Sequence, residues 1–77
     1  NGTAHINLGR AYYRAGYPGD AQHERALEAF ADAIVADPQT YGPIVIASLQ
    51  QIGYTWKGDL EEITRRVERK QRAAELG

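Results

Sequence analysis

Apolar residues recur at three- and four-residue steps in several stretches of the chain, a spacing typical of helices that bury one face. The first stretch predicts a helix over about 4–15, with Thr3 as its cap and Gly16 at its end. We expect one apolar stripe of this helix to face the core. It consists of Ala4, Leu8, Ala11, Tyr12 and Ala15.

A second helix is predicted between two sets of helix-stopping residues. Tyr17-Pro18-Gly19 ends the first pattern, and Asp20 is a good N-cap for the second helix. This helix must stop before Pro38, because the residue preceding a proline is pushed out of helical geometry. Its apolar stripe consists of Ala26, Leu27, Phe30, Ala33 and Ile34.

A third helix is predicted to start at Gly42-Pro43, where proline in the first helical position loses no hydrogen bond. Its β-branched residues also suit a strand. However, the segment from Pro43 to Thr55 is long for a strand, and Ser48, Gln51 and Thr55 share one helical stripe. We expect this helix to be the buried middle of the fold, since it is apolar nearly all round. Its apolar residues are Ile44, Val45, Ile46, Leu49 and Ile52.

A fourth helix is predicted to open with Asp59 and Glu62 as a capping box, in which each side chain accepts from an unpaired backbone N–H. Its apolar stripe is narrow, so we expect this helix to pack over the core with one face and to carry ion pairs on its solvent-exposed faces. The stripe consists of Leu60, Ile63, Val67 and Ala74, and the expected pairs are Glu61–Arg65, Glu62–Arg66 and Glu68–Arg72.

Composition narrows the class of protein. The chain has 77 residues, 43% of them hydrophobic and 25% charged, which suits one small globular domain. No apolar run approaches the length of a membrane-spanning helix, so we expect a soluble protein. The absence of cysteine fits a reducing compartment such as the cytoplasm, although localisation stays open. Because the chain contains no Met, we expect a fragment or a processed product.

Two short patterns resemble one unit of the tetratricopeptide repeat family. The first is His5-x-x-Leu8-Gly9-x-x-Tyr12, and the second is Ala26-x-x-x-Phe30-x-x-Ala33 followed by Pro38. The resemblance implies that Gly9 and Ala26 are small because two helices cross closely there, while Tyr12 and Phe30 fill the space between them.

The resemblance therefore predicts an all-α fold of two antiparallel helix pairs, stacked as a helical-repeat fragment that spans residues 1–77. The first repeat covers about 2–40, with about five extra residues over 17–22 and with His5 in place of the family's Trp. The second unit, about 44–77, is a degenerate repeat or a cap: Tyr54 and the turn at 57–59 fit, but Gln50 and Gln51 replace Leu-Gly.

The family's concave groove is lined by the first helix of each repeat, so the resemblance implies a non-enzymatic scaffold that binds a protein or peptide. In the first unit this groove wall comprises Thr3, Ile6, Asn7, Arg10, Tyr13 and Arg14, of which Asn7, Arg10 and Arg14 suit a carboxylate. The alternative is an ordinary solvated helix face. In the second unit the matching face comprises Val45, Ser48, Leu49, Ile52, Thr55 and Trp56.

Trp56 is either a core tryptophan or an anchor for a partner or a second copy of the chain. The candidate partner-binding residues are Asn7, Arg10, Tyr13, Arg14, Ile52 and Trp56. Two repeats are fewer than are usually needed to bury a continuous core. We therefore expect self-association or a missing parent domain.

An alternative function is nucleic-acid binding through the last helix. Five cationic residues, Arg65, Arg66, Arg69, Lys70 and Arg72, lie close together there, as phosphate binding requires. Three nearby glutamates offset part of that charge, and the net charge of the whole chain is −1. Binding to nucleic acid is therefore the less favoured prediction.

The sequence contains no recognisable catalytic or metal-binding motif. No serine–histidine–aspartate set, phosphate-cradling glycine loop or zinc-type spacing is present, so we expect no enzymatic activity, cofactor or metal. His5 is expected to be a packed or half-exposed residue in the family's aromatic position. His23 is expected to be a surface residue in the first turn of its helix.

Overall fold

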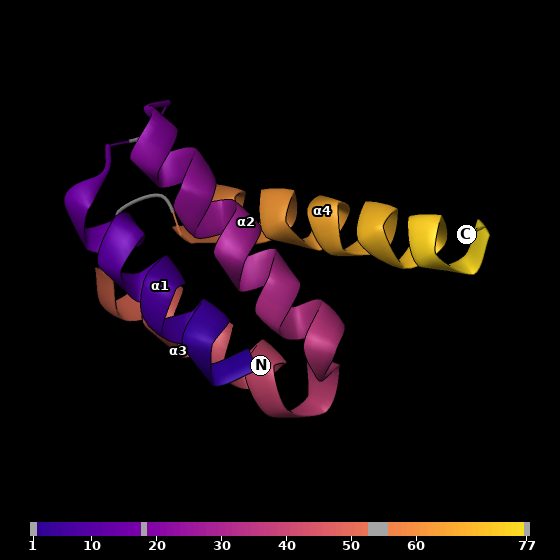
Figure 1. Cartoon of the computed structure of the whole chain (residues 1–77). Coiled ribbons are helices and arrows are strands. Elements are labelled where there is room, and N and C mark those ends of the chain that lie inside the picture. Colours follow the sequence, from indigo (N-terminus) through magenta and orange to yellow (C-terminus); the bar gives the residue numbers. More distant parts are fainter. Residues whose placement is uncertain (1, 18, 53–55, 77) are drawn as a thin grey trace.

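A computed structural model describes residues 2–17, 19–52 and 56–76 of the chain. Within these residues the secondary structure consists of four helices and no strand, which confirms the all-α fold class (Figure 1). The helices are α1 (Gly2–Ala15), α2 (Ala21–Ala36), α3 (Pro38–Ile52) and α4 (Trp56–Leu76). None of them is both long enough and apolar enough to cross a membrane.

Helix α2 forms the centre of the fold, because it packs more extensively against the other three helices than any of them does. Phe30 in its middle is fully enclosed, and the predicted stripe faces the core, with Ile34 only partly buried. The prediction that 43–55 forms the buried middle is wrong. In α3 only Val45, Ser48 and Leu49 are buried, whereas Ile44 and Ile46 are exposed on either flank, since no described segment covers those flanks.

Helices α1 and α2 approach closely at Gly9. A Cβ atom added at Gly9 would lie 2.8 Å from a carbon of the Phe30 ring, so only glycine allows this approach. Ala26, the other small residue expected in the contact, is fully buried. The predicted contact between Gly9 and Phe30 is therefore confirmed.

The face of α1 that points inward differs from the prediction. The buried residues are Gly2, Ile6, Gly9 and Tyr13, whereas Leu8 is 48% exposed. Tyr12 is half-buried at the edge of the core, and the aromatic ring that packs edge-on against Phe30 is that of Tyr13, with 5.9 Å between centroids. The stripe formed by Leu8, Ala11 and Ala15 therefore points outward.

Asp37 connects α2 to α3. Its backbone N–H donates to the carbonyl of Ala33 at 3.2 Å and ends α2, as predicted, just before Pro38. Its side chain accepts from the backbone N–H of Thr40 at 3.3 Å and so caps α3. Pro38 is therefore the first residue of α3, and Pro43 lies inside the helix. The predicted start at Pro43 is wrong because Asp37-Pro38 supplies an earlier N-cap and first position.

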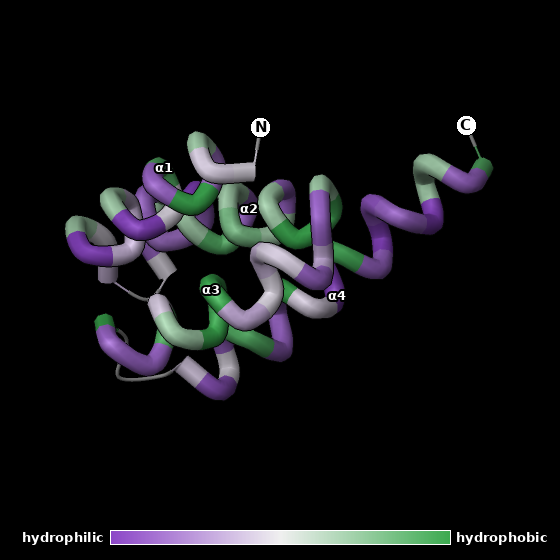
Figure 2. Tube along the Cα trace, turned by 90° about the horizontal axis from the view of Figure 1, so that it is seen from below, coloured by the Kyte–Doolittle hydropathy of each residue, from purple (hydrophilic) through white to green (hydrophobic). Residues whose placement is uncertain are grey.

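Helix α4 starts at Trp56, three residues before the predicted cap at Asp59. The predicted stripe is confirmed at Ile63 and Val67, but Ala74 is exposed because α4 continues past the other helices. Its last turns stand clear of the other helices in Figures 1 and 2. Three residues used in the sequence interpretation, Pro18, Tyr54 and Thr55, lie outside the described part of the chain.

Candidate functional site

A buried polar cluster joins three helices at the end of α1. The hydroxyl of Tyr13 (α1) donates a hydrogen bond to Oδ2 of Asp59 (α4). The other oxygen of this carboxylate lies 3.0 Å from Nε2 of His23 (α2). The rings of Tyr13 and His23 are also neighbours, with 5.4 Å between their centroids. We call Tyr13, His23 and Asp59 the buried triad.

Local structure places His23 in the buried triad. Asp20 caps α2 by accepting from the backbone N–H of His23 at 2.8 Å, which puts His23 in the first turn. A Cβ atom at Gly16 would lie 2.6 Å from that same backbone nitrogen, so the chain entering α2 passes very close to the end of α1. The prediction that His23 lies on the surface is wrong, because its ring turns toward Asp59 and is buried.

The predicted role of Asp59 was to cap its own helix, but instead it accepts hydrogen bonds across the core. In the tautomer that carries a proton on Nε2, His23 donates a hydrogen bond to Oδ1 of Asp59. Burial, together with the hydrogen bond to Asp59, raises the pKa of the Tyr13 hydroxyl well above its usual value. No sequence signal pointed to this triad, because its members come from helices far apart in the chain.

The buried triad is best explained as a structural hydrogen-bond network that links three helices inside the core. Its three side chains satisfy one another inside the core, where an unpaired polar group would be costly. A catalytic role would require access for a substrate, and all three residues are almost completely buried. The triad holds α1, α2 and α4 together, and it thereby fixes which face of α1 points outward.

Only some of the residues predicted to line the groove of the first unit are exposed. Ile6 and Tyr13 are buried, so the prediction that they line an accessible groove is wrong. Both lie on the stripe of α1 that packs against α2. Asn7 and Arg14 are exposed and Arg10 is half-buried. Thr3 is exposed, and its hydroxyl lies 3.1 Å from the hydroxyl of Tyr41 in α3.

The predicted face of the second unit is mostly core. Val45, Ser48 and Leu49 are buried, and the hydroxyl of Ser48 donates to the carbonyl of Ile44 at 2.9 Å. Ile52 and Trp56 are partly buried and pack against the edge of the core. The ammonium group of Lys57 lies 5.7 Å from the centre of the Trp56 ring. Trp56 therefore lies at the edge of the core and is partly accessible, and its role as an anchor for a partner stays a prediction.

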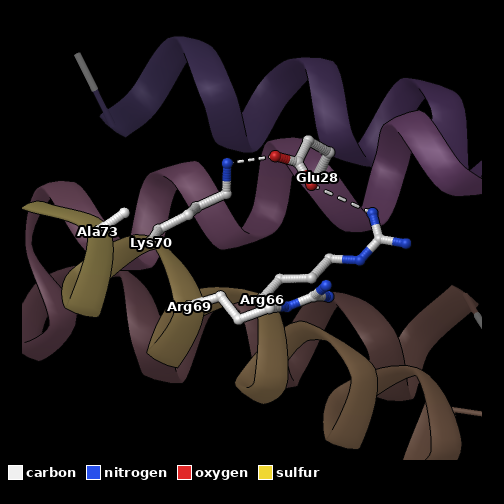
Figure 3. A pocket seen from close by; sticks show the side chains of 5 residues that line it. All are labelled: Glu28, Arg66, Arg69, Lys70 and Ala73. Atoms are coloured by element: carbon white, nitrogen blue, oxygen red, sulfur yellow. Dashed lines mark hydrogen bonds and ion pairs between the residues drawn. The ribbon is translucent and has the colours of Figure 1, made fainter.

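Two cationic residues of α4, Arg66 and Lys70, face acidic residues of α2, and Figure 3 shows their pairs with Glu28. Arg66 pairs with Glu24 and, at 3.2 Å, with Glu28. One turn later, Lys70 pairs with Glu28 and, at 2.9 Å, with Asp32. This matching order shows that α2 and α4 run in the same direction where they meet.

Within α4, Glu62 extends the network. It pairs with Arg66 at 2.9 Å, as the sequence predicts, and also with Arg65 and Arg69. The hydrogen bond from Lys70 lowers the pKa of Glu28 and raises the pKa of Lys70. These pairs are partly exposed to water, so each contributes little stability.

Glu28, Arg66, Arg69, Lys70 and Ala73 line an open hollow of about 390 Å³ between α2 and α4. Because Arg66 and Lys70 already have carboxylate partners, little unneutralised charge remains there to hold an anion. No group of three or more His, Cys, Asp or Glu side chains among the described residues is arranged to hold a metal ion.

Comparison with known proteins finds no relative of this chain: no protein family, no curated protein and no solved structure matches it.

Proposed function

We propose that this chain is a protein–protein interaction scaffold of the tetratricopeptide-repeat type. Two features support the proposal. Gly9 lies where α1 meets Phe30 of α2, and the small residue Ala26 of α2 is fully buried, as expected for the first helix pair of such a repeat. In addition, α2 and α4 run in the same direction, which suits two helix pairs placed side by side.

One observation carries the proposal: the cations of α1 are unneutralised. Among the described residues, neither Arg10 nor Arg14 forms an ion pair, whereas Arg66 and Lys70 of α4 each have two or more acidic partners. Helix α1 itself contains no acidic residue. Arginines held on a helix without a carboxylate partner are suited to bind one from another molecule.

The position of these arginines defines the expected binding groove. Thr3, Asn7, Arg10 and Arg14 are spaced by four, three and four residues, so they share one flank of α1. The hydroxyl groups of Thr3 and Tyr41 lie 3.1 Å apart, so this flank borders α3. A peptide with acidic side chains or a terminal carboxylate that lies between α1 and α3 would meet Asn7, Arg10 and Arg14.

Binding of an acidic peptide with a free C-terminal carboxylate, measured by calorimetry, tests the proposal. We expect Arg10→Ala and Arg14→Ala each to weaken binding by about tenfold, the loss of one charge-assisted contact. Helicity measured by circular dichroism should not change. Arg72→Ala on the exposed end of α4 is the matched control and should bind like the wild type. Equal affinities for all four proteins would remove α1 from the binding site.

The partner can also be a second copy of the chain, since helical repeats bury their faces by stacking against neighbouring units. Sedimentation velocity at micromolar concentration tests this expectation. A concentration-dependent increase in mass would support self-association, whereas a stable, well-folded monomer would exclude it.

The geometry does not favour the alternative of nucleic-acid binding through α4. Arg66 and Lys70, at the centre of the basic run, point toward the carboxylates of α2. Only Arg65, Arg69 and Arg72 remain on the exposed side. A phosphate backbone would have to compete with Glu24, Glu28 and Asp32 for the two central cations.

A further inference from the structure

Helix α1 carries an apolar stripe on its solvent side, opposite its buried face. Leu8, Ala11 and Ala15 are spaced by three and four residues, so they share one side of the helix, and all three are exposed. Leu8 is the largest of them. The half-buried ring of Tyr12 forms one edge of the stripe and connects it to the core. We call these four residues the outer stripe.

Positive charge lies on both sides of the outer stripe. On the side toward α3, Arg14 is exposed and lies next to Asn7. On the side toward α2, the guanidinium group of Arg25 lies 6.0 Å from the centre of the Tyr12 ring. Among the described residues, neither arginine forms an ion pair with a carboxylate. The outer stripe therefore has a cationic border.

The nearby acidic residues of the chain are engaged elsewhere. Asp20 accepts from backbone N–H groups at the start of α2. Glu24, Glu28 and Asp32 pair with Arg66 and Lys70, where α2 meets α4. A second copy docked through the same stripe would bring two cationic borders together, and such like-charge contacts oppose association.

We propose that the outer stripe docks an amphipathic helix of a partner protein whose apolar face is bordered by acidic residues. The small side chains of Ala11 and Ala15 allow a helix to approach closely, and Leu8 and Tyr12 provide apolar contact area. Glutamate or aspartate on both edges of the partner helix would reach Arg14 and Arg25. This inference rests on the proposed scaffold function, for which it names a partner class and a second surface of α1 that adjoins the groove beside α3 and shares Arg14 with it.

A synthetic helical peptide tests the inference. The probe has leucines at i, i+4, i+7 and i+11 and glutamates along both edges of that face, and its binding to the full chain is measured by fluorescence anisotropy. We expect a dissociation constant of roughly micromolar size, as is usual for a small interface. A second peptide with lysines in place of the glutamates should bind at least about tenfold more weakly.

Three variants locate the binding surface. Leu8→Asp places a charge in the middle of the stripe and Arg14→Glu reverses its border, so each should weaken binding by about tenfold or more. Leu76→Asp is the matched control, because Leu76 is 85% exposed at the far end of α4 (Figure 1). It should bind like the wild type. Circular dichroism should show the same helicity for all three, since each substituted side chain is exposed.

Several results would overturn the inference. One such result is equal affinity of the acidic helical peptide for Leu8→Asp and for the wild type. Another is that this peptide does not bind the wild type at all. The two proposals can also fail separately. Suppose that Arg10→Ala weakens binding of the carboxylate peptide, that Leu8→Asp does not, and that the synthetic helical peptide does not bind. The scaffold function would then stand, and the outer stripe would be excluded as a docking site. If neither probe binds, both proposals fail. Dissociation of a dimer by Leu8→Asp in sedimentation would assign the stripe to a second copy instead.

Discussion

The hydroxyl of Tyr13 donates a hydrogen bond to the carboxylate of Asp59, a residue 46 positions further along the chain. The same carboxylate lies 3.0 Å from the ring of His23. One buried carboxylate therefore connects α1, α2 and α4. This connection fixes the rotation of α1 about its axis and with it the surface that the helix presents to a partner.

Tyr13→Phe should destabilise the fold by about 1–3 kcal/mol, because Asp59 stays buried and loses this donor. Urea unfolding followed by circular dichroism measures the change. Tyr17→Phe is the matched control: Tyr17 is 78% exposed, so its free energy of unfolding should change by less than about 0.5 kcal/mol. Equal stability of the two variants would show that the triad contributes nothing.

Tyr13 should stay protonated at a pH where ordinary tyrosines ionise. Burial raises its pKa, so the folded state keeps its proton above about pH 10, the usual tyrosine value. A group with a raised pKa gives stability that is present below its unfolded pKa and lost as pH rises toward its folded pKa. Tyrosine ionisation can be followed by absorbance as the pH is raised. Below the pH at which the protein unfolds, the wild type and Tyr13→Phe should give the same curve, because Tyr13 does not ionise there. Upon unfolding, the total absorbance change should be smaller in the variant, which lacks one tyrosine.

Local signals in the sequence were sufficient to predict α2. Asp20 caps it, Pro38 follows its end, and Phe30 lies at its buried centre. These signals act within a few residues of each position, so the sequence alone reveals them. The close approach at Gly9 and Phe30 was also expected, because the two short patterns resemble a tetratricopeptide repeat, in which a small residue lies where the paired helices cross.

The face of α1 could not be predicted because two stripes compete in this helix. Ala4, Leu8, Ala11 and Ala15 have the same spacing as Gly2, Ile6, Gly9 and Tyr13. Two contacts favour the second stripe: Gly9 fits against Phe30, and the hydroxyl of Tyr13 donates a hydrogen bond to Asp59. The hydrogen bond depends on α4, which comes much later in the chain. Periodicity within one helix does not contain that information. The same applies to His23, which is buried and whose ring contacts Asp59 of a later helix.

Gly9→Ala should destabilise the protein although alanine favours helices. The new Cβ atom would lie 2.8 and 2.9 Å from two carbons of the Phe30 ring, which is fully enclosed, so the ring or the helix would have to shift. Overpacking of this kind costs about 1–3 kcal/mol, which exceeds the gain of about 1 kcal/mol in helix propensity. Chemical denaturation should therefore give a lower midpoint.

Gly58→Ala in the first turn of α4 serves as the control for that substitution. Nothing lies within 4 Å of a Cβ atom placed there, so the gain in propensity has no opposing contact. Its midpoint should equal or exceed that of the wild type. A Gly9→Ala variant as stable as Gly58→Ala would contradict the close approach of α1 and α2.

Acid should destabilise the fold through its paired carboxylates. The hydrogen bond from Lys70 lowers the pKa of Glu28, and those from Arg66 and Arg65 lower the pKa of Glu62. Stability from a lowered pKa is present above the unfolded value, here about 4.5, and is lost as pH falls through the folded value. Thermal melting at pH 7 and pH 3 should show a lower midpoint at pH 3. Glu28→Gln should reduce this difference, and an unchanged difference would contradict the role of Glu28.

Nucleic-acid binding should depend on the acidic residues of α2. The wild-type chain should bind duplex and single-stranded DNA weakly at low salt, because Glu24, Glu28 and Asp32 neutralise Arg66 and Lys70. Glu24→Gln combined with Glu28→Gln releases part of that charge and should strengthen binding. Tight, salt-sensitive binding by the wild type, measured by anisotropy of labelled strands, would support the alternative function.

The triad, the groove and the outer stripe all depend on the rotation of α1 about its axis. Nuclear Overhauser contacts between side chains report that rotation in solution. We expect contacts from the Tyr13 ring to Phe30 and His23, with Leu8 showing no contact to Phe30. Contacts from Leu8 and Tyr12 to Phe30, with Tyr13 in solvent, would show that α1 is turned the other way and that all three features are wrong.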